Sequence, residues 1–518
     1  MYRVVLLSIF VFLIFFSIGY SELPDIIGII QSDTVLTNFG YRIVPLGDQN
    51  NDGFDDIIVW DYRFAAYLYY GGDPFDTIPA LRIDSVNDRI SNVGDINGDG
   101  FNEFAMLGRN PFSWKLNLYF GGPFIDTVRD MWFGADSLRG MGYTVCADDI
   151  NSNGNNDLIC WCTLQKSVLL FELGTDSDSI PDLQISPANL DAANNEYNSF
   201  GERIITGDFN GDGITDLVIN LRPRVQQQIP GSLYLYWGGA SFDTIPDMII
   251  NRSDIFQEDY ESFGIVLENL GDFNGDGYDD FYAGNSAGSD SLGFIFFGGP
   301  DIDTLPDLTL CEKTDKARLA GDVNNDGYND LITGYQSSWS GLGHAHIYLG
   351  GPDCDSIPDL SIYNYEFSGY QNYFAMDCAG IGDFNGDGID DYAISALNAD
   401  SRGRIYICSG WDDNTDLHDE DQSVKPLNFK LSQNYPNPFN PSTTIEFELM
   451  RKSNVELTVY DILGRRVSSL INQTMPAGSH KIRWDGRNQN GDNVASGIYF
   501  YKIKTDQFSD TKKMVLVR

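Results

Sequence analysis

The chain has 518 residues, with 33 Lys and Arg against 75 Asp and Glu, which gives a formal net charge of −42. Its length allows roughly two to four domains or one large repeat array, and 42% hydrophobic residues exclude a mainly disordered chain. The acidity argues against nucleic acid or an anionic membrane surface as a partner, because both repel a negative protein. It suits a protein that binds cations.

The amino terminus has the pattern of a secretory signal peptide over residues 1–21. Arg3 supplies the positive charge, residues 4–18 form the apolar segment, and Gly19, Tyr20 and Ser21 have the small-x-small spacing of a cleavage site. A membrane anchor is the alternative, but about 15 apolar residues are fewer than the ~20 that span a bilayer. We therefore expect cleavage after Ser21, export, and no transmembrane segment in the mature protein.

The motif D-x-N-x-D-G-x-x-D then recurs seven times, with first aspartates 47, 54, 59, 64, 50 and 61 residues apart. We number its residues 1 to 9. Positions 1, 3, 5 and 9 carry side-chain oxygens in every copy, and position 6 is always glycine. The four oxygen-bearing residues of each copy, in chain order, are Asp48, Asn50, Asp52 and Asp56; Asp95, Asn97, Asp99 and Glu103; Asp149, Asn151, Asn153 and Asp157; Asp208, Asn210, Asp212 and Asp216; Asp272, Asn274, Asp276 and Asp280; Asp322, Asn324, Asp326 and Asp330; and Asp383, Asn385, Asp387 and Asp391.

This motif has the chemistry of a calcium loop. Calcium takes six to eight oxygen ligands at about 2.3–2.6 Å, and side-chain oxygens at positions 1, 3, 5 and 9 converge if the chain turns sharply at the glycine. The alternative is an Asx-rich turn without an ion, which leaves crowded carboxylates uncompensated. We therefore predict up to seven calcium ions, one per repeat. The third copy, with only two carboxylates, is expected to be the weakest site.

The residues between the motifs predict an all-β fold. Short apolar runs such as IIVW at 57–60 follow each motif, a second run ends in Gly-Gly in five repeats (as in YLYYGG), and a third resembles DTIPDL in six repeats. Each repeat then forms a four-stranded antiparallel sheet, and seven such sheets form a seven-bladed β-propeller over residues 22–411. The seventh repeat lacks its last strand, so we predict that residues 23–30 pair with Arg404–Cys408 and complete that blade.

Two segments carry a family resemblance. "SFG…GDFNGDGITDLVI" at 199–219 and "SFG…GDFNGDGYDDFYAG" at 262–284 resemble FG-GAP repeats, which form the seven-bladed propeller of integrin α subunits. The resemblance covers residues 23–411 and implies calcium in a hairpin on one rim of each blade, with position 9 as an acidic ligand. Most copies lack the Gly-Ala-Pro part of the signature.

The composition changes near Pro426. Residues 426–518 contain 13 basic and 8 acidic residues, and the acidic stretch before them, residues 412–425, is predicted to be a linker. Alternating segments at 444–449, 455–460, 480–484, 498–504 and 513–517 predict a small immunoglobulin-like β-sandwich.

The same segment resembles the type A sorting domain of the type IX secretion system. The resemblance rests on "NYPNPFNPSTTIEFEL" at 434–449, "VYDILGRRV" at 459–467 and "WDGRNQNGDNVASGIYFYKI" at 484–503. It implies recognition of residues 426–518 by the translocon, a secreted or outer-surface location, and often removal of the domain with attachment to surface lipopolysaccharide. The segment is also similar to the immunoglobulin-like domain of the flagellar hook-capping protein, which implies only a spacer.

Seven cysteines lie in the acidic part of the chain, and none has zinc-type CxxC spacing. Cys146 precedes Asp149 by three residues and Cys160 follows Asp157 by three, which predicts that the two lie opposite each other in a hairpin. A disulfide is one interpretation. Two small buried hydrophobic side chains are the interpretation that we favour.

No nucleophile elbow, zinc-protease helix or P-loop occurs in the sequence, and His344 and His346 alternate on one predicted strand, where a structural role is expected. We predict a non-catalytic, calcium-stabilised binding or adhesion protein for an extracellular glycan or protein ligand. The alternative is a secreted carbohydrate-active enzyme, a polysaccharide lyase or glycosidase, with its site on the propeller loops. Ligand-binding residues are expected on the face opposite the calcium loops, and they are Trp114, Arg222, Arg224, Trp339 and Tyr370.

Overall fold

The computed structural model describes residues 25–517, with gaps at 33–37, 109–114, 124, 134–140, 164, 174–179, 187–198, 223–230, 253–262, 286–291, 337–342, 364–372, 398, 400–401, 413–429, 432–433, 435, 438, 450–452, 462–464, 476–477, 490–492 and 506–508. The chain divides into two compact units, residues 1–414 and 415–518. The predicted signal peptide and all but Asp412 of the predicted acidic linker lie outside the described residues. Among the described residues, no helix is long and apolar enough to cross a membrane.

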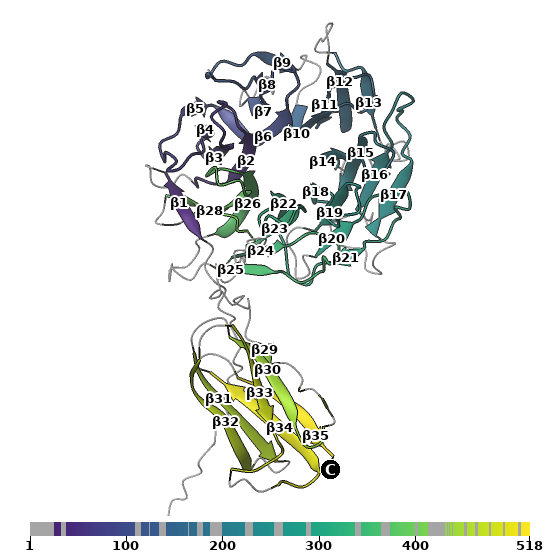
Figure 1. The fold of residues 1–518 in the computed structure, drawn as a ribbon. Coiled ribbons are helices and arrows are strands. Elements are labelled where there is room, and N and C mark those ends of the chain that lie inside the picture. The colour runs from purple at the N-terminus through teal and green to yellow at the C-terminus, as the bar shows by residue number, and fades with distance from the viewer. Residues whose placement is uncertain are drawn as a thin grey trace, which may run out of the picture. The chain divides into compact units, whose positions relative to one another are not determined.

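The first unit contains seven four-stranded antiparallel sheets arranged as the blades of a β-propeller (Figure 1). Blades 1 to 3 contain β2 (Arg42–Gly47), β3 (Asp56–Asp61), β4 (Ala65–Tyr69) and β5 (Leu81–Asp84); β6 (Val86–Gly94), β7 (Glu103–Gly108), β8 (Leu116–Tyr119) and β9 (Met131–Phe133); and β10 (Met141–Asp148), β11 (Asp157–Cys162), β12 (Ser167–Glu172) and β13 (Leu183–Ile185). Blades 4 to 6 contain β14 (Ser199–Gly207), β15 (Asp216–Arg222), β16 (Ser232–Tyr236) and β17 (Met248–Asn251); β18 (Val266–Gly271), β19 (Asp280–Gly284), β20 (Gly293–Phe296) and β21 (Leu308–Thr309); and β22 (Lys316–Gly321), β23 (Asp330–Tyr335), β24 (His344–Tyr348) and β25 (Leu360–Tyr363). Blade 7 contains β26 (Phe374–Gly382), β27 (Asp391–Ala396), β28 (Arg404–Cys408) and β1 (Ile26–Gln31).

The apolar runs after the motifs become the second strand of each blade. These strands are buried along all or nearly all of their length, and β3, β11 and β27 are buried throughout. A strand with both faces buried needs apolar side chains on both, which explains why the runs are continuous rather than alternating. The buried side chains form seven clusters, one between each pair of adjacent blades. The core is therefore a ring of seven blade-to-blade interfaces.

The ring closes as the sequence predicts. Strand β1 pairs antiparallel with β28 at the outer edge of blade 7, with Ile26 opposite Cys408 and Ile30 opposite Ile405. Ile30 is fully buried in the cluster between blades 7 and 1. The innermost strand of blade 7, β26, lies against both β22 of blade 6 and β2 of blade 1. The strand extends to Gln31, while residues 23 and 24 of the predicted segment lie outside the described residues.

The second unit is a β-sandwich. One sheet contains β29 (Lys430–Leu431), β30 (Thr443–Leu449) and β33 (Gly478–Trp484), and the other contains β31 (Ser453–Asp461), β32 (Arg466–Met475), β34 (Gly497–Lys504) and β35 (Ser509–Leu516). Trp484, Tyr501 and Met514 are among the buried residues of its core. All five predicted strands are present. The sequence missed β29, which has only two residues, and β32, which is largely polar and so lacks a clear hydrophobic pattern.

The cysteine prediction is half wrong. Cys146 lies opposite Ile159, and Cys160 lies opposite Val145, so the two cysteines are one residue out of register and point to opposite faces of blade 3. Cys160 belongs to the core between blades 2 and 3, whereas Cys146 packs against the core between blades 3 and 4. All seven cysteines are free thiols. The favoured interpretation, small buried hydrophobic side chains, is confirmed for Cys160, whereas Cys146 is only partly buried.

Candidate functional site: the seven acidic loops

Each motif forms the loop between the first and second strands of its blade, so all seven loops lie at the same end of their blades. The loop of blade 1 shows the common geometry. The carboxylate of Asp48 accepts hydrogen bonds from the N–H groups of Asp52 (3.1 Å) and Gly53 (2.8 Å), and the Oδ1 of Asn50 accepts one from the Asp52 N–H (3.0 Å). These bonds wind the loop around its side-chain oxygens.

The glycine at position 6 makes this winding possible. Its φ lies between +81° and +95° in all seven copies, a region that other residues rarely adopt. A Cβ atom added at Gly53 would meet no atom within 4 Å. The glycine is therefore required by the turn and not by crowding.

The carboxylate at position 9 is buried beneath the loop. All seven position-9 residues have 0% exposure. In blade 4 the Asp216 carboxylate accepts hydrogen bonds from the Phe209 N–H (3.0 Å) and from the Gly238 N–H (2.9 Å), which belongs to the Gly-Gly turn after β16. Blades 1, 5 and 6 repeat both bonds. In blade 7 the Asp391 carboxylate accepts instead from the N–H groups of Asn385 and Gly410. In these blades position 9 thus joins the acidic loop to the turn after the third strand, which is a Gly-Gly turn in blades 1, 4, 5 and 6.

Burial dominates the electrostatics of these carboxyl groups. It raises the pKa of Asp216 to about 7, partly offset by the backbone hydrogen bonds and reinforced by the charges of Asp212 and Asp208. The other position-9 carboxyl groups are raised to about 7 or 8, with burial the largest cause in each case. Ionising a position-9 carboxyl group therefore costs free energy in the absence of a cation.

The second loop brings three acidic groups closest together. Carboxylate oxygens of Asp95, Asp99 and Glu103 all lie within 4.8 Å of one another, the single such group among the described residues. Glu103 is the one glutamate at position 9, and its carboxylate accepts hydrogen bonds from the Ile96 N–H (2.8 Å) and from the Asn97 side-chain amide (3.0 Å). The extra methylene lets the buried group reach the loop oxygens.

The third loop differs from the others. Neither carboxylate oxygen of Asp157 has a partner in hydrogen-bonding geometry, and Leu173 stands at the place of the first glycine of the Gly-Gly turn. The structure also adds an acidic group that the sequence analysis missed, because Glu172 accepts a hydrogen bond from the Asn151 side-chain amide (3.2 Å) and its charge helps to raise the pKa of Asp157. In the sequence, the acidic residue Glu172 directly before Leu173 was the feature that could have indicated this additional group.

Neighbouring loops are connected across the blades, which the sequence analysis did not anticipate. The residue at position 8 of three blades is an aspartate that accepts a hydrogen bond from the position-1 N–H of the preceding blade. These pairs are Asp279 with Asp208 (3.0 Å), Asp390 with Asp322 (2.9 Å) and Asp55 with Asp383 (2.9 Å). The last pair joins blade 1 to blade 7, so the acidic loops take part in closing the ring.

The predicted ligand face lies largely outside the described residues. Trp114, Arg224, Trp339 and Tyr370 all fall there. Arg222 is described, and its guanidinium forms an ion pair with Glu202 (3.2 Å). A cluster of aromatic rings that the sequence analysis missed lies at the same end of blade 1, and it contains Tyr41, Trp60, Tyr62 and Phe64. Tyr62 is 55% exposed.

The two adjacent histidines are structural. His346 is 1% exposed, its ring lies 4.5 Å from that of His344, and its Nδ1 lies 2.8 Å from the Oγ of Ser361. Burial lowers the pKa of His344 to about 4 and that of His346 to about 3, where the charge of His344 also contributes. Both rings are neutral at pH 7.

The histidine pair predicts a loss of stability in acid. Both folded-state pKa values lie below the ~6.5 of an unfolded histidine, so this stability is fully present above about pH 6.5 and is lost as the pH falls towards 4. At pH 5 the cost is on the order of 2 kcal/mol per histidine. The double variant His344→Gln/His346→Gln should therefore show a smaller fall in melting temperature between pH 7.5 and pH 5 than the parent. Ser361→Ala, which keeps both titrating groups, should retain the full fall; an equal fall in all three proteins would contradict this.

Comparison with known families bears on both units. Residues 433–517 match the family described as "Secretion system C-terminal sorting domain". The chain is also 29% identical to integrin alpha-4 of Xenopus laevis over 152 residues, which is 28% of this chain and 14% of that protein. It is 31% identical to integrin alpha-5 of Xenopus laevis over 123 residues, which is 21% of this chain and 11% of that protein. The chain thus spans a small part of these relatives.

Two solved structures resemble the chain at low identity and low TM-score. PorZ, a bacterial surface component of the type IX secretion system of Porphyromonas gingivalis, shares 12% identity with a TM-score of 0.21, over 92% of this chain and 70% of PorZ. Sqt1 of Saccharomyces cerevisiae shares 10% identity with a TM-score of 0.37, over 82% of this chain and 96% of Sqt1. The assignment of the propeller therefore rests on the seven sheets of this chain. The propeller is similar to part of integrin α subunits. The matched segment shows that the chain carries a secretion system C-terminal sorting domain, which directs it through the type IX secretion machinery to the cell surface or the extracellular space.

Proposed function

We propose that this protein is a non-catalytic binding or adhesion module whose propeller is stabilised by calcium. The observation that carries the proposal is the repetition of one loop geometry seven times, each with a buried carboxylate beneath a loop of side-chain oxygens. The similarity to integrin α subunits favours the same interpretation.

The donor set of the loops fits calcium. Positions 1, 3, 5 and 9 offer carboxylate and amide oxygens as ligands, and the carbonyl of position 7 adds another, which matches the preference of a hard cation. Calcium bound there would compensate the negative charge of the buried position-9 carboxylates. We expect up to seven ions, with the third loop the weakest, since its position 5 is Asn153 and not an aspartate.

The perturbed carboxyl groups support a non-catalytic role. Acid–base catalysts are usually found among groups whose pKa is strongly shifted. Among the described residues, every carboxyl group that burial raises to a pKa of about 7 or 8 is a position-9 residue. The seven-fold repeat accounts for all of them without a catalytic role.

The ligand of the module can be sought with arrays. The full-length secreted protein, applied to glycan and extracellular-protein arrays in calcium and again in EDTA, should be captured by a discrete set of spots in calcium only. Trp339→Ala and Tyr370→Ala should abolish capture if the face opposite the loops binds. Full capture by both variants would contradict that face, and shortening of a captured polysaccharide during incubation would favour the carbohydrate-active enzyme.

A further inference from the structure

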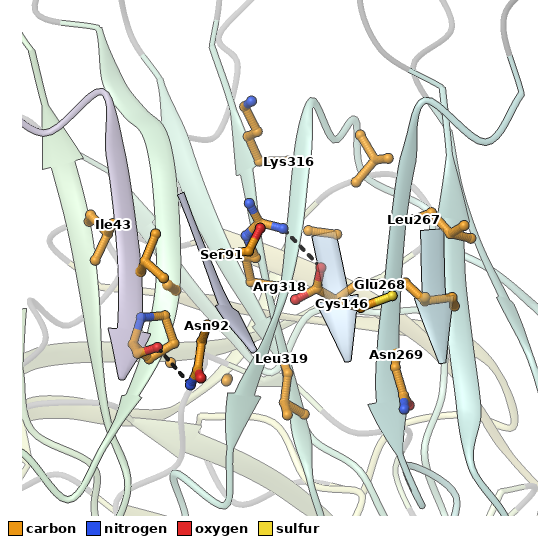
Figure 2. A pocket seen from close by; sticks show the side chains of 18 of the residues that line it. Ile43, Ser91, Asn92, Cys146, Leu267, Glu268, Asn269, Lys316, Arg318 and Leu319 are labelled. Atoms are coloured by element: carbon orange, nitrogen blue, oxygen red, sulfur yellow. Dashed lines mark hydrogen bonds and ion pairs between the residues drawn. The ribbon is translucent and has the colours of Figure 1, made fainter. Parts of the chain in front are cut away.

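A cavity of about 580 Å³ lies in the centre of the propeller. The innermost strands of all seven blades contribute to its lining, from β2, β6, β10, β14, β18, β22 and β26. Figure 2 shows side chains from several of these strands directed into it. Its volume is in the range of about 300–1,000 Å³ that is typical of small-molecule pockets.

The charge of this cavity is opposite to that of the propeller. Four cationic side chains line it, Arg42, Arg203, Lys316 and Arg318, against the acidic residues Glu268 and Asp390. Arg89 and Asp377 lie close enough to interact electrostatically with Arg42. Residues 22–411 contain 18 Lys and Arg in all, so these five cationic residues are more than a quarter of the total. A very acidic unit has gathered its scarce positive charges in one place.

The cationic groups occupy two adjacent levels of the channel. In the β-sheet register Arg42 lies opposite Trp60 and Lys316 lies opposite Gly334, four residues beyond the buried position-9 carboxylate of each blade. Arg318 and Glu268 lie one level nearer the acidic loops and form an ion pair of 2.9 Å. Figure 2 shows Lys316 beyond this pair, on the side away from Asn92 and Asn269. The outer level is therefore the end opposite the acidic loops, and the group is separate from them.

The described acidic groups near the channel offset its positive charge only in part. Glu268 pairs with Arg318. The Asp377 carboxylate accepts a hydrogen bond from the Ile43 N–H (2.8 Å), and its single charge acts on Arg42, Lys316 and Arg318 together. Arg203 donates to the carbonyls of Ile265 (2.8 Å) and Glu202 (3.1 Å), which supply no full negative charge. The Nε of Arg42 is buried and has no hydrogen-bond partner.

The cationic groups repel one another. Burial is the largest cause of a fall in the pKa of Arg42 to about 9, and the charges of Arg318, Arg203 and Arg89 lower it further against the opposing effect of Asp377. Burial and the charge of Arg89 likewise lower the pKa of Arg203 to about 10. Desolvated like charges are unfavourable unless an opposite charge compensates them.

We propose that the central channel is a binding site for a small oxyanion, such as the sulfate, phosphate or carboxylate group of an extracellular molecule, held by Arg42, Arg203 and Lys316. Guanidinium and ammonium groups donate charge-assisted hydrogen bonds to such oxygens, which are stronger than bonds between neutral groups. The anion neutralises the repulsion within the channel and gives the Arg42 Nε an acceptor. The site does not depend on calcium, so it can be tested independently of the proposed calcium loops.

The test uses the full-length protein and millimolar sodium sulfate, with sodium chloride at matched ionic strength as the reference. Sulfate should raise the melting temperature, and calorimetric titration should give saturable binding that Arg42→Met or Lys316→Met weakens by at least about tenfold, as expected for the loss of a charge-assisted bond. Methionine keeps most of the apolar stem of the side chain and removes its charge. The matched control is Arg82→Gln, because Arg82 is an exposed residue paired with Asp84, and it should bind sulfate as the parent does.

Two further readouts exclude a merely structural role for the arginine. In sulfate-free buffer Arg42→Met should be as stable as the parent or more stable, because the variant removes a repelled charge. Glucuronate titrated in parallel distinguishes a preference for carboxylates from one for tetrahedral anions. Equal sulfate affinity in the parent and in both channel variants, or no sulfate effect beyond that of chloride, would overturn the proposal.

Discussion

Removing calcium should lower the melting temperature of the propeller by about 10 °C or more. Without cations the carboxylates of each loop repel one another, and the position-9 groups are buried anions whose pKa is raised by that burial. At a calcium concentration of 100 times the Kd, each occupied site adds about 2.7 kcal/mol. Since 1 kcal/mol shifts the melting temperature of a large domain by about 2–4 °C, two occupied sites are enough for this effect.

The measurement is a thermal melt of the full-length protein in EDTA and in calcium, starting from a sample whose metal content has been verified. Magnesium should substitute poorly, because it requires a smaller octahedral site and retains its water. An unchanged melting temperature in EDTA would show that the loops are turns without an ion.

Two matched substitutions separate calcium binding from hydrogen bonding. In Asp216→Asn, the amide cannot accept from both the Phe209 and the Gly238 N–H groups as the carboxylate does, so the protein should be less stable even in EDTA. The calcium gain should also shrink by about one site, or ~2.7 kcal/mol. In Asp157→Asn no hydrogen bond of full geometry is lost, because the Ile150 and Asn151 N–H groups make only weak contacts with the carboxylate, and a buried charge disappears. That variant should match or exceed the parent in EDTA and keep nearly the whole calcium gain, because the third loop is the weakest.

The second large effect concerns the strand that closes the ring. Ile30→Asp places a charge in the core between blades 7 and 1, where Ile30 is fully buried, and it should destabilise the propeller by on the order of 4 kcal/mol or more. The melting temperature should fall by about 10 °C. The control is Ile29→Asp on the same strand, which is 41% exposed and should have only a small effect.

A chain that lacks residues 22–31 tests the same point without introducing a charge. Deleting these residues exposes the outer edge of β28 and part of the core between blades 7 and 1. The shortened chain should therefore melt well below the parent and aggregate more readily. Equal melting temperatures for the two chains would show that the pairing of β1 with β28 contributes nothing to stability.

The sequence alone determined the number of blades, the loop chemistry and the place where the ring closes. The seven motifs are local, and each needs only its own nine residues to present oxygens around a glycine with positive φ. The closure could be inferred by counting strands, because the seventh repeat lacks its last strand and the amino terminus has one additional strand. The pairing of β1 with β28 confirms this inference. The sorting domain could be recognised because its motifs are contiguous in the chain.

The tertiary structure decided whatever depends on register or on distant strands that meet. Cys146 and Cys160 lie on opposite faces because the hairpin pairs Asp148 with Asp157, and a shift of one residue in a strand reverses the face of every side chain. The position-9 carboxylate binds a Gly-Gly turn about 20 residues away, as Asp216 does with Gly238. The cationic channel needs residues as far apart as Arg42 and Arg318 to meet, and no local pattern marks them. Only the closed ring, which brings all seven innermost strands to one axis, makes these scattered charges into neighbours.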